Sequence, residues 1–108
     1  MAVTPSEIIA PGFVTNPTTT AYTSTAAKTR IDYMTFTNES AANVTFNLYI
    51  GNPADVLPPR IKNKTVLPGE AYSCPEVIGA LLQPGYVIKF DCSAASALYG
   101  SANGVTFT

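Results

Sequence analysis

Apolar and polar residues alternate without a break between residues 44 and 50. The positions between the apolar residues hold polar or amphipathic side chains, and Tyr49 is the largest of them. Because successive side chains of a β-strand point to opposite faces of its sheet, a period of two predicts a strand with one buried and one partly solvated face. The residues expected on the buried face are Val44, Phe46, Leu48 and Ile50.

Residues 29–38 predict a second strand, in which Met34 and Phe36 face inward and Tyr33 faces outward. Ile31 breaks the alternation, so we expect a β-bulge near Asp32. Residues 86–92 predict a third strand, with Lys89 and Asp91 on its outer face. Weaker strand patterns occupy residues 60–67, 71–74, 96–100 and 104–108.

Turn residues separate these segments. Two Pro-Gly steps, Pro68–Gly69 and Pro84–Gly85, fit turns in which proline presets φ and glycine takes a positive φ. Further turns or loops are expected at residues 38–43, 51–59 and 101–103. About eight short strands separated by turns are typical of an antiparallel β-sandwich, and we expect an all-β, jelly-roll-like one.

Residues 75–82 are the exception to the strand pattern. Val77, Ile78, Leu81 and Leu82 have helical spacing, and Pro75 suits a first helical turn. We therefore expect a short helical corner here, one or two turns long, which packs its apolar residues over one end of the sandwich.

The first 20 residues predict an extended N-terminal arm, followed by a sandwich domain at residues 21–108. Pro5, Pro11 and Pro17 would confine any strands in the arm to sheet edges. Such an arm lies either on its own body or on a neighbouring subunit, and a poorly ordered terminus is the alternative.

Charge is scarce in this sequence. Of the 108 residues, 12% are charged and 46% are hydrophobic, whereas about 25% charged residues is typical. A small domain with so few charges is expected to press its surface against a partner, although an inert surface is the alternative. The candidate interface residues are Ile8, Ile9, Phe13 and Val14 in the arm, and Tyr49, Arg60 and Lys62 in the body.

Several partner classes are disfavoured. The six Lys and Arg residues are spread along the chain, which argues against nucleic acid. Only Arg60, Lys62 and Lys64 are close together, and we interpret them as one charged face of an edge strand. A membrane partner is not expected, because no segment approaches the length of a membrane span. The N-terminus does not resemble a signal peptide, so folding in a cytoplasm is expected.

Catalytic chemistry has little support in the residues. The chain has no histidine, and its carboxylates are scattered. Cys74 beside Glu76 would need a basic neighbour to act as a nucleophile, and none is nearby in sequence. Cys74 and Cys92 lack zinc spacing, so two buried free thiols are favoured over a disulfide. We expect no enzyme activity, no cofactor and no metal.

Three segments carry a resemblance to a known family: "TRIDYMTFTNESAANVTFNLYI", "VLPGEAYSCPEVIGALLQPGYVIKF" and "SALYGSANGVTF". Their turn and strand motifs resemble small virion proteins of tailed bacteriophages, in particular capsid decoration (cement) proteins. The resemblance implies a jelly-roll-like β-sandwich on the outer capsid surface of the virion, assembled in the bacterial cytoplasm. Its implied partners are the major capsid protein and further copies of itself, in a homodimer or another homo-oligomer.

Two alternatives stay open at this point. Similar small proteins also occur as tail, neck or head-fibre components of a virion. A carbohydrate- or receptor-binding module is the other alternative, because the six tyrosines offer rings on which sugars can stack.

Overall fold

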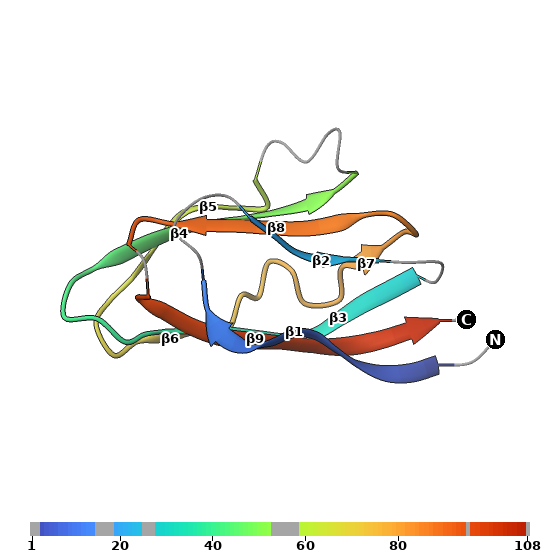
Figure 1. The fold of residues 1–108 in the computed structure, drawn as a ribbon, viewed down its shortest axis with the longest axis horizontal. Helices are drawn as coiled ribbons and strands as arrows, with labels where there is room; N and C mark the ends of the chain where they lie inside the picture. Colours follow the sequence, from blue (N-terminus) through green and yellow to red (C-terminus); the bar gives the residue numbers. More distant parts are fainter. Residues whose placement is uncertain (1–2, 15–18, 25–27, 53–58, 95, 108) are drawn as a thin grey trace.

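The computed structural model describes residues 3–14, 19–24, 28–52, 59–94 and 96–107. The described chain is all-β, contains no helix, and pairs every strand antiparallel (Figure 1). Its nine strands are β1 (Val3–Phe13), β2 (Thr19–Thr23), β3 (Lys28–Asn38), β4 (Val44–Gly51), β5 (Ile61–Val66), β6 (Ala71–Tyr72), β7 (Leu81–Leu82), β8 (Val87–Cys92) and β9 (Leu98–Phe107).

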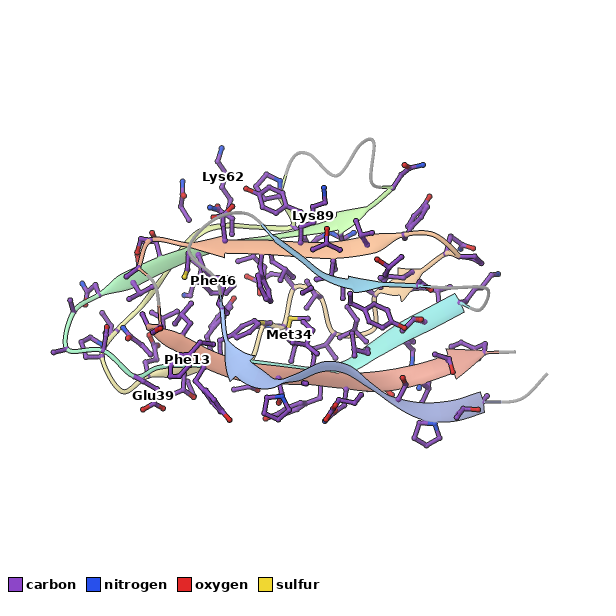
Figure 2. All side chains as sticks on the ribbon, in the orientation of Figure 1. Phe13, Met34, Glu39, Phe46, Lys62 and Lys89 are labelled. Carbon is purple, nitrogen blue, oxygen red and sulfur yellow. The ribbon has the colours of Figure 1, made fainter. Side chains whose placement is uncertain are left out.

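The strands form two sheets that lie face to face. The first sheet has the order β1-β9-β3-β6, with β7 also paired to β3, and the second has the order β2-β8-β4-β5. Pairs are nested along the chain: β1 with β9, β2 with β8, β3 with β7 and β4 with β5. The core lies between the sheets, where Figure 2 shows Met34 and Phe46. The predicted all-β, two-sheet architecture is therefore confirmed.

Strand β3 confirms its predicted pattern. The register against β9 shifts between Ile31 and Tyr33, which is the bulge expected near Asp32. Because the bulge adds one residue, both Ile31 and Met34 turn inward and are fully buried. Tyr33 consequently stays on the outer face, with 48% of its surface exposed.

Strand β9 differs from the prediction of two strands joined by a turn at residues 101–103. It is continuous from Leu98 to Phe107, with Ala102 buried in the core. The small residues that suggested a turn serve close packing instead. A Cβ at Gly104 would collide with the backbone oxygen of Arg30, and one at Gly100 would collide with β3 in the same way.

The prediction of a helical corner at residues 75–82 is wrong. Residues 75–79 form turns, and Leu81–Leu82 is strand β7. Backbone hydrogen bonds tie this segment to the edge of β3, from Gly79 N–H to the Ile31 oxygen (2.7 Å) and from Ile31 N–H to the Ala80 oxygen (3.0 Å). Val77 and Leu82 are fully buried in the core as expected, whereas Ile78 and Leu81 are 44% and 46% exposed, so the expected packing of this segment is confirmed only in part.

The N-terminal segment is not confirmed as an arm. Val3–Phe13 is an edge strand of the first sheet and pairs with β9 from Val3↔Phe107 to Phe13↔Tyr99. Of the two placements expected, the described residues take the one on the chain's own body. The edge position predicted from Pro5 and Pro11 is confirmed.

Both Pro-Gly turns form as predicted. Gly69 and Gly85 have φ values of 76° and 87°. In the first turn Glu70 N–H donates to the Leu67 oxygen (2.9 Å), and the Glu70 carboxylate accepts a bond from Leu67 N–H (2.9 Å). These turns set the reversals after β5 and before β8.

Asn38, the last residue of β3, is a buried polar node. Its side-chain NH₂ donates to the backbone oxygens of Ala42 (2.8 Å) and Val66 (2.9 Å). Its side-chain oxygen accepts bonds from the Ser40 N–H (2.9 Å) and the Ser40 hydroxyl (2.7 Å). One side chain thereby joins the β3–β4 turn to the end of β5.

A second polar node lies at the opposite end of β3. The Thr29 hydroxyl is 3.0 Å from the hydroxyls of both Tyr22 and Ser24. Thr29 and Ser24 are fully buried. Each buried hydroxyl has a partner, as burial of polar groups requires.

Candidate functional site

Among the described residues, four of the seven large hydrophobic side chains that are exposed lie on the outer face of the first sheet. We call it the aromatic face. It forms on β1, β9 and β3, the lower layer in Figure 1. Exposed fractions reach 56% for Val3, 49% for Phe13, 48% for Tyr33 and 42% for Tyr99. Alternation along β9 adds half-buried residues to the same face, and its large members together are Val3, Phe13, Tyr33, Tyr99, Val105 and Phe107.

The charges on the three strands of the aromatic face cancel, and Glu39, just beyond the end of β3, adds one negative charge on the same side of the molecule (Figure 2). Lys28 and Arg30 provide two positive charges, and Glu7 and Asp32 provide two negative ones. Arg30 Nε donates to Asp32 Oδ1 at 2.7 Å, and this hydrogen bond raises the pKa of Arg30. A neutral apolar surface of this kind favours contact with protein over contact with a charged polymer.

Three of the rings on this face contact other side chains. Phe13 and Tyr99 meet edge to face, with centroids 5.1 Å apart and planes at 76°. The Arg30 guanidinium lies over the Phe107 ring, 5.7 Å from its centroid. Stacking on a sugar needs an open ring face, and these contacts cover part of the ring surface, so the arrangement suits protein packing better.

The outer face of the second sheet is polar, and we call it the polar face. Asp91 accepts hydrogen bonds from Asn47 Nδ2 (2.8 Å) and from the Tyr49 hydroxyl (2.9 Å). Partial burial raises the pKa of Tyr49, and the hydrogen bond to Asp91 is the second cause of the increase. Figure 2 shows Lys62 and Lys89 projecting on this side of the molecule.

Cations outnumber anions on the polar face. Arg60 and Lys62 are exposed and Lys89 is half-buried, whereas Asp91 is the carboxylate among them. Among the described residues of this face, three positive charges and one negative charge leave a net charge of +2. The polar face is therefore suited to an acidic protein surface.

The expected alternation of Arg60, Lys62 and Lys64 on one face is wrong. Asn63 has a φ of 49°, and the β4–β5 register shifts at this point. Two residues of β5 oppose one of β4, so Lys64 pairs with inward-facing Phe46 and turns toward the core side. Its ammonium lies 4.6 Å from the centroid of the Tyr72 ring.

The predicted interface residues separate into three groups. Ile8 and Val14 lie in the chain's own core, with 4% and 1% exposed, so as placed they offer no surface to a partner. Ile9 is half-buried against that core. Phe13 belongs to the aromatic face, and the predicted residues on the polar face are Tyr49, Arg60 and Lys62.

Sequence reasoning missed much of the aromatic face. Val3, Tyr99, Val105 and Phe107 were not among the predicted interface residues. A usable signal exists in β9, where the even positions 100, 102 and 104 hold small residues and the odd positions include Tyr99, Val105 and Phe107. The interpretation of residues 101–103 as a turn concealed that alternation.

Cys74 occupies a packing position. Both cysteines are free and buried, as predicted. Burial, with the negative charge of Glu76 acting in the same direction, raises the pKa of Cys74 to about 12. A nucleophilic thiol needs the opposite shift. Glu76 accepts a hydrogen bond from the Tyr72 hydroxyl, and burial together with this bond raises the pKa of Tyr72.

Comparison with known proteins gives no relative: no protein-family model, curated protein or solved structure matches the chain. Within the described ranges, no group of three or more His, Cys, Asp or Glu side chains is placed to hold a metal ion. The same ranges hold no helix with the length and apolar character to cross a membrane.

Proposed function

We propose that this protein is a capsid decoration protein of a tailed-bacteriophage virion, which binds the major capsid protein on the outer shell and bridges neighbouring subunits. The observation that carries the proposal is the pair of chemically different outer faces, one neutral and aromatic, the other polar and basic. The polar, basic face offers a contact surface for the shell, and the rigid sandwich leaves the opposite, aromatic face for a second protein partner.

The nested strand order supports the jelly-roll-like topology that the sequence predicts. Each successive pair, from β1 with β9 inward to β4 with β5, lies inside the previous one. A chain wrapped in this way brings strands distant in sequence into both sheets.

The polar face is the surface that we assign to the shell. Its net positive charge, carried by Arg60, Lys62 and Lys89, complements an acidic patch on the capsid protein. The hydrogen-bonded cluster around Asp91 fixes Asn47 and Tyr49 in position, which lowers the entropy lost when they form contacts.

Binding to undecorated heads tests this function. Purified protein mixed with heads that lack it is expected to co-sediment with them at a fixed stoichiometry. A Lys62→Glu variant is expected to bind less, with the loss largest at low salt. The matched control is Asn43→Glu in the exposed β3–β4 turn, outside both faces, which should bind heads normally. Absence of head binding, or binding to tails instead, would reject the proposal.

A further inference from the structure

One edge of each sheet, β1 in the first and β5 in the second, is a poor surface for association. Pro5 and Pro11 remove N–H donors from β1, and its register with β9 shifts twice. The edge strand β5 carries Lys62 and the bulge at Asn63. Prolines, bulges and lysines are the devices that prevent strand addition at an edge. Strand addition at these two edges is therefore disfavoured, and the outer faces are the better surfaces for association.

From these observations we infer that the aromatic face binds the aromatic face of a second copy, to form a face-to-face homodimer. Two copies of one sheet share the same twist, which is the condition for aligned packing of sheet on sheet. The two positive and two negative charges of the face leave no net repulsion between copies. Exposed Phe13, Tyr33 and Tyr99 would be covered in the dimer.

The available area is sufficient for such a dimer. Strand β9 has ten residues, which extend about 34 Å at about 3.4 Å per residue. Three strands at about 4.8 Å spacing give a width of about 14 Å. The projected area of two such faces is about 1,000 Å². Because side chains make the surface uneven, the accessible surface buried on contact is larger than the projected area and exceeds the threshold of roughly 1,000 Å² for a stable interface.

Register and charge select one orientation of the two copies. Glu7, Asn103 and Tyr33 form the middle row of the face, and Arg30 lies in the next row beside Val105. If the two-fold axis of the dimer ran perpendicular to the strands, Glu7 of one copy would lie over Glu7 of the other. If the axis runs along β9 instead, Glu7 of one copy lies over Tyr33 of the other, within reach of that copy's Arg30. The second arrangement avoids stacking Glu7 on itself and places it beside the Arg30–Asp32 ion pair of the second copy, and we assign it to the dimer.

This inference goes beyond the proposed function and adds a geometric consequence to it. A face-to-face dimer leaves the two polar faces pointing away from each other. One polar face of the dimer can then contact the shell while the other points outward, so a single shell engages the dimer through one face at a time. The dimer itself does not require the shell, so its failure and the failure of head binding are separate results.

Sedimentation velocity of the full chain tests the dimer. Wild type is expected to pass from monomer to a species of twice the 11.4 kDa chain mass below about 200 µM. Tyr33→Arg is expected to raise the dimer Kd at least about thirtyfold, the effect of losing a central aromatic contact. The matched control Thr65→Arg, an exposed site on β5, should leave Kd unchanged. Far-UV circular dichroism checks the fold, and Tyr99→Arg replaces Tyr33→Arg if the latter unfolds.

Three results would overturn the inference: a wild-type monomer at every concentration, a dimer unaffected by both arginine variants of the face, or a dimer lost in Thr65→Arg. Glu7→Gln tests the orientation separately. This variant should raise the dimer Kd about threefold, because it removes the attraction between Glu7, on the edge strand β1, and Arg30 of the second copy. Strengthening by Glu7→Gln would overturn the assigned axis.

Discussion

Replacing Asn38 by alanine should be among the most damaging single changes in this protein. Asn38 is 1% exposed, and its side chain makes four hydrogen bonds that join the β3–β4 turn to the end of β5. Alanine removes all four and leaves the buried Val66 oxygen without its donor. At about 1 kcal/mol for each bond, plus the cost of an unsatisfied carbonyl, the expected loss is about 3–5 kcal/mol of unfolding free energy.

Urea unfolding followed by tyrosine fluorescence measures this loss, since the chain has six tyrosines and no tryptophan. The matched control is Asn43→Ala in the same turn, where the side chain is exposed and the expected change is within about 0.5 kcal/mol. A loss below about 1 kcal/mol for Asn38→Ala would show that the node does not hold the two turns together.

Three further outcomes follow from the packing. Gly104→Ala should lower the free energy of unfolding by about 2–3 kcal/mol, because the new Cβ would collide with the backbone of β3. The control Gly12→Ala should be nearly neutral, since its Cβ would make only an ordinary contact at 3.8 Å. Equal urea midpoints for the two variants would contradict this prediction. Both thiols should react with a disulfide reagent only after unfolding, and rapid reaction of native protein at pH 8 would argue against their burial. The raised pKa values of Cys74 and Tyr72 predict stability that is fully present below about pH 9 and falls as pH rises toward 12, because the unfolded groups ionise first; a flat stability profile between pH 8 and 11 would contradict it.

The parts of the fold that sequence predicted well are those set by local rules. The bulge near Asp32 was visible because Ile31 broke a strict period of two, and the two Pro-Gly turns were visible because glycine is the residue that accepts their positive φ. Burial of Val44, Phe46 and Leu48 followed from alternation alone.

The errors arose where tertiary contacts outweigh local preference. The apolar spacing of residues 75–82 fits a helix, yet hydrogen bonds to both sides of Ile31 hold that segment as turn and strand. Asn63 belongs to a residue type that adopts positive φ more readily than most, but the alternation of Arg60, Lys62 and Lys64 concealed the bulge that redirects Lys64. In β9, Gly100 and Gly104 signalled a turn but are there because β3 passes too close for any larger side chain.

The aromatic face could be recognised in part from sequence. Phe13 was a candidate on composition, and Tyr33 was placed outward by alternation. Whether these residues share one surface depends on the pairing of β1 and β3 with opposite sides of β9, which brings together positions more than 60 residues apart. Such long-range register has no local signature.

The positions of Thr29 and Asn38 at the two ends of β3 have a consequence for the uniqueness of the fold. A strand of alternating apolar residues tolerates a slip of two positions, since the same kinds of side chain still face inward. A slip of β3 would separate both polar side chains from the partners that only the native alignment supplies. The central strand is thus fixed along its own axis, and a double variant with apolar residues at both sites should keep its sheets while sampling shifted alignments.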